Sequence, residues 1–412
     1  IERGRYRTYR RQVYLRAEKK TAIIGLQFKS YRKAFYFYIM VVRYPLYLSK
    51  FQCAAGACPD TCCQGWDISI DPKTLACYRR ACGNLGRRIP QGVDYKRGCL
   101  VFQNGVCPFL DGSGLCSLQK EGGVHMISKA CRLYPRHVEE YGSRREWSLS
   151  FSCPEVARII LSRQEPIIFA EKMSAGKGRP DSEIDRDFLE VLLEIRRVAI
   201  EIGQDRKFTM ERRMAMVLAF AHDVQKRLDS GKRENSLGKI RKYLERFCCR
   251  TEAADKKFEE RCRALQKSER YRENLLLKYR DTFYEFAVIE NKWKKILSRL
   301  RRWEAGGRCM EKDSSKAACG LPYEHILVSY LDLYLPGAVY DGDVLSKVKL
   351  AVYHCLALHM LEGALGIPLE RLIHIYAREI EHSAGNLEYL EEMVKNRQEF
   401  DVNEMIASVY IG

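Results

Sequence analysis

Cysteine is concentrated in one part of this 412-residue chain, and this constrains the fold more than any other feature. Eleven of the 17 cysteines lie between Cys53 and Cys153. Four of these, at positions 53, 58, 62 and 63, fall within 11 residues, which is too dense for ordinary core packing. Short spacings bring several thiolates to one point at little loss of chain entropy, as a metal or cluster site requires.

Three kinds of site use cysteines at this density. A disulfide framework needs an oxidising compartment, but 17 is an odd number and no signal segment precedes the cysteines. Structural zinc commonly takes paired C-x2-C motifs, and neither the cysteines at 53–63 nor those at 107–153 have that spacing. An iron–sulfur cluster takes four thiolates and tolerates irregular spacing. The pattern therefore favours an iron–sulfur cluster, with zinc as the alternative.

The cysteines belong to a series of short motifs in a fixed order. The series is Phe51-x-Cys53, Cys58-x3-Cys62-Cys63, Trp66-x-Ile68-x-Ile70-Asp71, Cys107-Pro-Phe-Leu110, Gly114-Leu-Cys116, Cys131-x2-Tyr134-Pro-Arg136 and Leu149-x3-Cys153-Pro-Glu155. This order resembles the bacterial flagellin lysine-N-methylase family, part of a wider group of cysteine-rich proteins described as zinc- or iron-chelating. The likeness runs from about Tyr44 to the C-terminus and includes Tyr323-Glu-His-Ile-Leu327 and Arg378-x2-Glu381-His382.

The resemblance implies methyl transfer from S-adenosylmethionine to lysine side chains of flagellin, in the cytoplasm before export. It also implies a metal or a four-iron cluster bound by some of the eight matching cysteines, which are Cys53, Cys58, Cys62, Cys63, Cys107, Cys116, Cys131 and Cys153. Eight thiolates are twice what one zinc or one such cluster needs, so either two sites form or four cysteines are spare. Two interpretations remain for Trp66, Tyr134 and Arg136. Either they frame the site, or Trp66 is a buried core residue and Tyr134-Pro-Arg136 forms a turn.

The methyl donor has no standard binding motif here. The chain lacks the G-x-G-x-x-G turn of nucleotide-binding folds and the C-x3-C-x2-C of radical enzymes, so the donor site must be non-standard. The substrate lysine, with a pKa of about 10.4, must lose a proton before it can attack a methyl group. Asp71 and Tyr134 are candidates to accept that proton, although Asp71 before Pro72 is equally a helix N-cap.

Apolar residues at helical spacing fill the second half of the chain. Stripes beginning at Phe188 and Met210 predict two helices, and a third stripe predicts helix within 251–303. Further helices are expected at 321–335, 344–361, 369–381 and 387–394. We therefore expect a mainly α fold, with a cysteine-rich irregular module around a bound cluster or metal at 40–161, a linker at 162–182 and a helical domain at 183–412.

Charge and hydropathy exclude two classes of partner. The net charge is +18, but residues 1–39 hold 11 Lys/Arg against two Glu, and this stretch is expected to be an extension before a start at Met40. The rest is only mildly basic, so a nucleic-acid partner is not expected. The longest apolar run, 34–42, is too short to span a bilayer, so no membrane partner is expected. A non-catalytic iron- or zinc-binding protein with a helical interaction domain is the alternative function.

Overall fold

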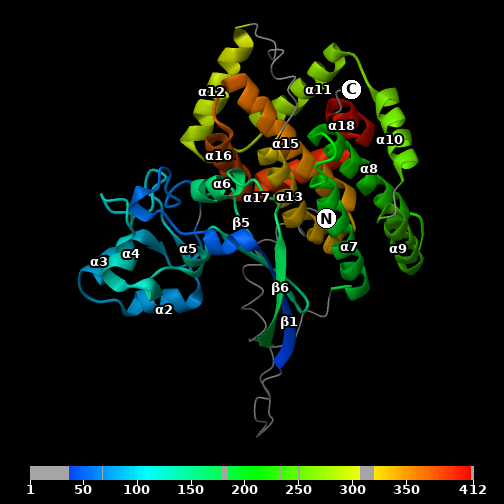
Figure 1. Ribbon diagram of the computed structural model, residues 1–412. Coiled ribbons are helices and arrows are strands. Elements are labelled where there is room, and N and C mark those ends of the chain that lie inside the picture. The colour runs from blue at the N-terminus through cyan, green and yellow to red at the C-terminus, as the bar shows by residue number, and fades with distance from the viewer. Residues whose placement is uncertain are drawn as a thin grey trace.

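Helices dominate the computed structural model of the chain (Figure 1). The described residues are 37–66, 68–177, 184–231, 233–248, 251–306 and 320–409. Almost all of the expected basic extension, 1–39, lies outside them. Two hydrophobic clusters organise the described part, a large one among the helices and a small one within the cysteine-rich segment. The prediction of a mainly α fold is confirmed.

The large body contains most of the helices. They are α6 Pro154–Leu161, α7 Arg186–Gly203, α8 Met210–Leu228, α9 Arg233–Cys248, α10 Glu252–Leu265, α11 Glu269–Asp281, α12 Asn291–Ala305, α13 Leu321–Tyr334, α14 Ala338–Asp341, α15 Val344–Leu365, α16 Leu369–Glu381, α17 Ala384–Asn396 and α18 Val402–Val409. Helices α7 and α8 confirm the first two stripes, since Phe188, Leu192, Met214 and Val217 are all buried.

Helix α15 lies at the centre of this body and contacts α8 and α13. Asp343 caps its start by accepting a hydrogen bond from the Ser346 N–H at 2.9 Å, and Gly366 ends it in the left-handed conformation. The helix is long and apolar enough to cross a membrane by length and composition alone, yet most of its apolar window is buried by its neighbours. A helix that is apolar on all sides is typical of a buried core, and α15 has that position.

The third stripe is broken in the structure. The segment 251–303 is helical as predicted, but α10, α11, a 3-10 turn and α12 divide it. Ser268 begins α11 by accepting a hydrogen bond from the Tyr271 N–H, which starts a new helix where the old one would continue. The connection before α12 is held by tertiary contacts, since the Ile289 and Glu290 N–H groups both donate to the Glu379 carboxylate at 2.8 Å.

The cysteine-rich segment forms a small lobe beside the helical body (Figure 1). Its elements are α2 Pro72–Arg80, α3 Gly83–Gly92, β2 Val93–Asp94, β3 Cys99–Leu100, α4 Ser117–Gly122 and α5 Lys129–Leu133. Ile89 and Phe109 are buried in its own cluster. Asp71 accepts hydrogen bonds from the Thr74 N–H and hydroxyl, which confirms its reading as the N-cap of α2.

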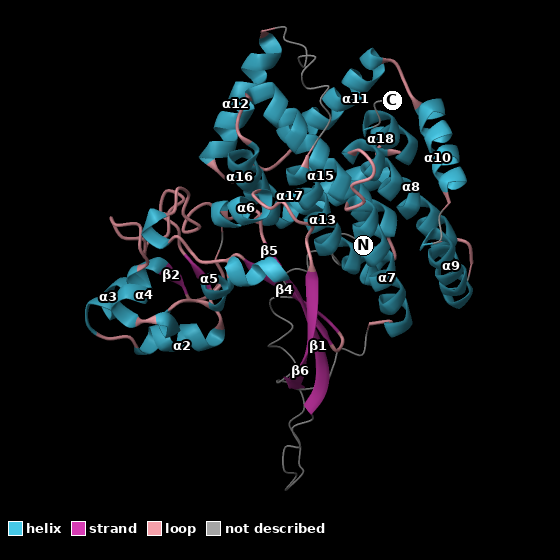
Figure 2. Cartoon of the chain, in the orientation of Figure 1, coloured by secondary structure: helices cyan, strands magenta, loops and turns pink. Residues whose placement is uncertain are grey.

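A four-stranded sheet lies below the helical body, between it and the lobe (Figure 2). Its strands are β1 Phe37–Pro45, β4 Arg136–Tyr141, β5 Arg144–Leu149 and β6 Phe169–Lys177, in the order β4-β5-β1-β6. Strand β1 pairs parallel with β5 and antiparallel with β6, with Val41 opposite Met173. Strand β6 falls inside 162–182, the segment expected to be a linker, so part of that segment is a strand paired with β1.

A buried group of charges joins the sheet to the helices. Glu146 on β5 accepts hydrogen bonds from Arg196 on α7, and Arg43 on β1 pairs with Asp332 on α13. Burial by itself would raise the pKa of Glu146, but Arg196, Arg43 and Arg144 lower it to about 2. The carboxylate is therefore charged at neutral pH and holds the strand against α7.

We predict that Glu146→Gln lowers the free energy of unfolding at pH 7 by about 3–5 kcal/mol, because the buried Arg196 guanidinium loses the carboxylate that accepts its two hydrogen bonds. The contribution of this charge is complete above the ordinary pKa of 4.5 and is lost as the pH falls through about 2. The difference between wild type and variant in urea unfolding should therefore shrink on acidification. The control is Glu194→Gln, whose exposed pair with Arg197 on α7 should contribute less than about 1 kcal/mol. Equal effects of the two substitutions would contradict the prediction.

Candidate functional site

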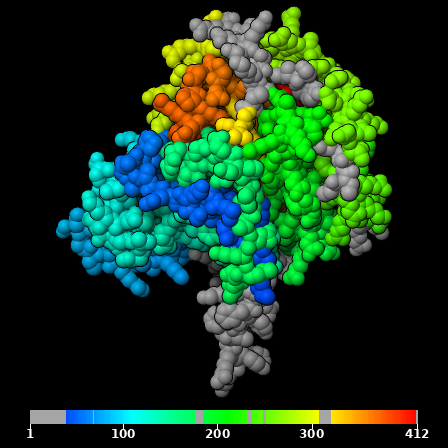
Figure 3. Space-filling view, viewed as in Figure 1, coloured from blue at the N-terminus to red at the C-terminus, as the bar shows by residue number. Residues whose placement is uncertain are grey.

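Arg378 of α16 binds the cysteine-rich segment to the helical body. Its guanidinium is almost fully buried. It donates to the backbone carbonyls of Asp60 at 2.8 Å and Ser152 at 3.0 Å, and to the Glu290 carboxylate at 3.1 Å. These partners come from the cysteine loop, the turn before α6 and the start of α12. One side chain thus sets the relative position of three distant segments, and Figure 3 shows the early chain in blue lying against the orange helices.

Asp60, which lies between Cys58 and Cys62 in the sequence, forms an ion pair with Arg378. Its carboxylate lies 3.0 Å from the Arg378 guanidinium, accepts a hydrogen bond from Gln64 and contacts His374 Nε2 at 2.9 Å and Lys292. Burial by itself would raise the pKa of Asp60, but His374, Arg378 and Lys292 hold it well below its usual range. A charged carboxylate therefore fixes the loop that holds three of the predicted ligand cysteines.

Trp66, Tyr134 and His382 form an aromatic cluster where this loop meets α16. The Trp66 and His382 rings stack with centroids 4.7 Å apart, and Tyr134 lies 5.6 Å from Trp66 and 5.9 Å from His382. Trp66 Nε1 donates to the Cys62 carbonyl at 2.7 Å, which fixes the indole beside the cysteines. The cluster joins the two sets of family-like motifs, one from each half of the chain.

Polar groups line one edge of the aromatic cluster. Ser152 Oγ lies 3.1 Å from His382 Nε2 and 3.2 Å from the Tyr134 hydroxyl. Ser152 also bonds to Ser150, which donates to the Glu381 carboxylate. Within the described part of the chain, His382 Nδ1 is buried and has no hydrogen-bond partner.

The ionisation of these rings follows from their burial. Burial, together with the nearby Arg378 cation, lowers the pKa of His382 to about 3. Burial raises the pKa of Tyr134 well above its usual value. At neutral pH the imidazole is therefore neutral with a free lone pair, and Tyr134 is a phenol that can donate a hydrogen bond but cannot serve as a tyrosinate base.

The eight predicted ligand cysteines fall into two neighbourhoods. Burial raises the pKa of the Cys107 thiol to about 12, and the nearby thiols of Cys63, Cys131 and Cys116 add to the rise. All four belong to or pack on the small cluster of the lobe. Burial also raises the pKa of Cys153, with Cys58 and Cys53 adding to it at the edge of the large cluster. Cys62 is electrostatically coupled to both neighbourhoods.

The donor chemistry suits a thiolate-bound metal or cluster, since the eight thiols lie in one region and none of them is in a disulfide. Within the described ranges, however, no three or more Cys, His, Asp or Glu side chains gather closely enough to hold a metal ion. The thiols are neighbours without being preassembled around one point. We therefore assign no step of the reaction to a metal or cluster.

The structure places the other predicted residues in different surroundings. Trp66 and Tyr134 come together, but Arg136 instead lies over the Phe51 ring at 4.9 Å from its centroid. Asp71 is engaged as a helix cap. Asp60, Ser150, Ser152 and His374 were not singled out from sequence, because single polar residues carry no pattern. The position of Asp60 within the cysteine loop is the one signal that could have drawn attention to it.

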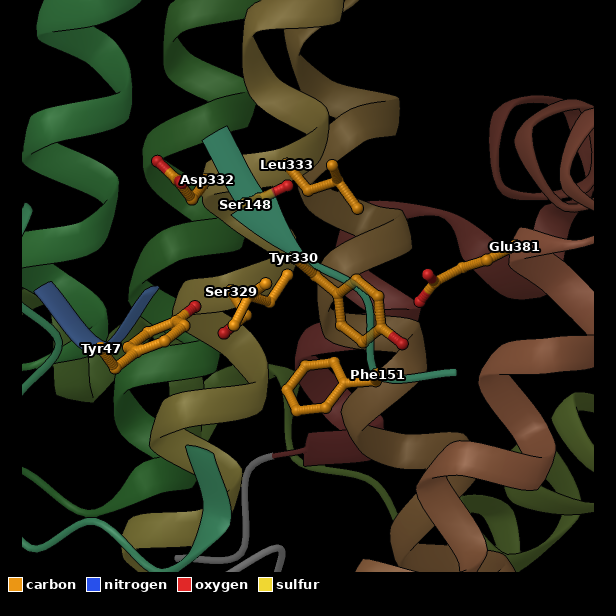
Figure 4. Close-up of a pocket in the computed structure, with 9 residues that line it drawn as sticks. Tyr47, Ser148, Phe151, Ser329, Tyr330, Asp332, Leu333 and Glu381 are labelled. Atoms are coloured by element: carbon orange, nitrogen blue, oxygen red, sulfur yellow. The ribbon is translucent and has the colours of Figure 1, made fainter. Parts of the chain in front are cut away.

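Neither of two cavities lined by residues of the helical body and the sheet includes the aromatic cluster. One, of about 10 Å³, is lined by Tyr47, Ser148, Tyr330, Glu381 and neighbouring side chains (Figure 4). It has room for about one water molecule. The other is an open groove of about 460 Å³ beside the start of α15, lined by Asp341, Asp343, Lys349, Lys395 and other mainly polar residues.

We predict that Asp60→Asn loosens the loop from Cys58 to Trp66, because Arg378 and Lys292 lose the carboxylate that neutralises them. The variant should lose about 3–5 kcal/mol of unfolding free energy. Hydrogen–deuterium exchange should rise in peptides covering residues 58–66. The matched control is Glu121→Gln, which breaks an exposed pair with Arg88 in the same lobe and should change little. Unchanged exchange in the Asp60 variant would contradict this role.

Comparison with known proteins places the helical part of this chain in a described family. The family model of the FliB lysine N-methylase C-terminal domain matches residues 196–408, just over half of the chain. This region contains Arg378, Glu381 and His382 but not the cysteine-rich lobe. No solved structure matches the chain.

Curated relatives agree with the family model. The chain is 33% identical over 147 residues to the flagellar biosynthetic protein FliU of Salmonella muenchen, covering 34% of this chain and 87% of that protein. It is 32% identical over 142 residues to a lysine-N-methylase of Salmonella typhimurium, covering 32% of this chain and 35% of the relative. The matched part thus spans about a third of that enzyme. With its C-terminal half matched by the family model, the chain belongs to the FliB lysine N-methylase family.

Proposed function

We propose that this protein transfers methyl groups from S-adenosylmethionine to lysine side chains of flagellin. Its family and the name of its lysine-N-methylase relative support lysine methylation, and the name of FliU links a second relative to the flagellum. The observation that carries the proposal is the meeting of Trp66, Tyr134 and His382, which joins the motifs of both halves in one cluster. Because flagellin is made before its export, we place the reaction in the cytoplasm.

The aromatic cluster suits the two cations of this reaction. A lysine ammonium and a methylsulfonium both carry positive charge, and the faces of Trp and Tyr attract cations. The neutral His382 adds no repulsion, and its unshared Nδ1 lone pair can take a proton from the ammonium. The resulting neutral amine attacks the methyl carbon, the carbon–sulfur bond breaks with its electron pair going to sulfur, and methylammonium and S-adenosylhomocysteine result.

We further propose that the cysteines bind an iron–sulfur cluster of the four-iron type, with zinc as the alternative. The density of thiols in the two neighbourhoods supports this proposal. The alternative function, a non-catalytic iron- or zinc-binding protein with a helical interaction domain, shares this property. Methyl transfer is what separates the two functions.

The deciding experiment is incubation of anaerobically purified protein with flagellin and S-adenosylmethionine, followed by mass spectrometry of flagellin peptides. Lysine peptides should gain whole methyl increments only when both the protein and the donor are present. The same sample should be brown with bound iron and sulfide; colourless protein with stoichiometric zinc would support the alternative metal. If the metal-loaded protein leaves flagellin unmodified, methyl transfer is contradicted and the non-catalytic function is supported.

We predict that Trp66→Leu lowers kcat/KM for methylation by about 5–30-fold, which corresponds to the loss of about 1–2 kcal/mol of cation–π attraction. Trp66→Phe should retain part of the activity, because a smaller aromatic face remains. Trp303→Leu, on α12 and outside the cluster, is the control and should leave kcat/KM unchanged once folding is verified by circular dichroism. Equal activity of the Leu and Phe variants at position 66 would contradict the cation-binding role.

A further inference from the structure

We propose that Ser152, Ser150 and Glu381 form a proton relay that carries the substrate's proton away from His382. This inference rests on the proposed function and deepens it by naming the path of the proton. Glu381 and His382 are consecutive at the end of α16, and the two serines lie in the turn between β5 and α6. The hydrogen bonds between them form a continuous chain from the imidazole to the carboxylate.

The direction of donation along these hydrogen bonds follows from counting the protons that each group can donate. An ionised carboxylate can only accept, so the single hydroxyl proton of Ser150 points to Glu381. Ser152 must then donate its own hydroxyl proton to Ser150. With that proton used, Ser152 Oγ can only accept from its two other neighbours, the Tyr134 hydroxyl and His382 Nε2.

This count fixes the tautomer of His382. Nε2 carries the hydrogen and donates it to Ser152, so Nδ1 carries the lone pair. Nδ1 is the atom that has no partner within the described residues. This series of hydrogen bonds therefore keeps Nδ1 as a proton acceptor in the aromatic cluster, where the proposed function places the substrate amine. Because the atom is covered in this structure, the substrate must displace a neighbouring ring to reach it.

The surroundings of His382 explain why a relay is needed rather than a simple base. Among the described residues, Tyr134 from the lobe side contacts it, and Arg378 and Glu381 lie beside it on its own helix. Arg378 disfavours a second cation, and burial lowers the pKa of His382 to about 3, so an imidazolium would be short-lived. The imidazole must release one proton from Nε2 as it gains another on Nδ1.

The proton balance closes over one turnover. The ammonium gives a proton to Nδ1, the Nε2 proton moves to Ser152, the Ser152 proton moves to Ser150, and the Ser150 proton moves to Glu381. The carboxylate becomes a carboxylic acid, and the neutral amine attacks the methyl group. After the product leaves, Nδ1 gives its proton to water, and the carboxylic acid returns its proton along the serines to Nε2.

The small cavity lies at the far end of the relay. Glu381 lines it together with Ser148 and Tyr330, and Figure 4 shows its carboxylate reaching toward Tyr330. A cavity of about 10 Å³ has room for about one water molecule, and Ser148, Ser329 and Glu381 in its lining supply hydrogen-bond partners. Such a water would hydrate the carboxylate, which lowers the cost of keeping Glu381 ionised inside the protein and so able to accept a proton.

The first test reads the tautomer directly and needs no turnover. Nitrogen-15 NMR of histidine-labelled full-length protein should place the His382 hydrogen on Nε2, with assignment by the loss of signals in His382→Gln. Ser150→Ala frees the Ser152 hydroxyl to donate toward His382, so a population with the hydrogen on Nδ1 should appear. A wild-type protein with the hydrogen on Nδ1 would overturn the relay whether or not the protein methylates flagellin.

The second test reads the rate of single-turnover methylation against pH. At saturating flagellin, Ser150→Ala should lower the single-turnover rate constant by about 100-fold near pH 7, and the deficit should shrink toward pH 10, where substrate lysine deprotonates unaided. Ser150→Thr keeps the hydroxyl and should restore the rate. A Ser150→Ala variant as fast as wild type, or one whose deficit is the same at every pH, would overturn the relay. An inactive wild-type protein would instead overturn the proposed function.

Discussion

The buried guanidinium of Arg378 is the interaction on which the arrangement of the site depends. A guanidinium has five N–H donors, and here they meet the carboxylates of Asp60 and Glu290 and the carbonyls of Asp60, Thr61 and Ser152. A buried charge is costly unless it is paired and hydrogen-bonded, so these acceptors cannot move independently of α16. The cysteine loop, the turn before α6 and the start of α12 are thereby held together.

The same helix places the chemistry next to this anchor. His382 lies four residues after Arg378, so the two side chains lie on neighbouring parts of one helix face. The face that holds the cysteine loop therefore also presents the imidazole to Trp66 of that loop. Burial and the Arg378 charge keep the imidazole neutral, and the bond of Arg378 to the Ser152 carbonyl positions the serine that receives the imidazole hydrogen.

Much of the fold could be predicted because it depends on local pattern. The apolar stripes on α7 and α8 and the cap at Asp71 need only neighbours along the chain, and all are found in the structure. Strand β6 could not be predicted, because its residues alternate poorly and its pairing with β1 joins segments more than 100 residues apart. The break between α11 and α12 likewise depends on Glu379, which lies about 90 residues away.

The candidate site divides in the same way. The sequence by itself determined the family resemblance, the cysteine-rich segment and the choice of Trp66, Tyr134 and Arg136 as candidates to frame the site, because motif order and residue density are properties of the chain. Only the tertiary structure decided that Arg136 lies elsewhere and that His382, Ser152 and Asp60 belong with them. Buried charges and hydrogen bonds select partners by proximity in space, and the contacts of Asp60 with His374 and of Ser152 with His382 join residues more than 200 positions apart.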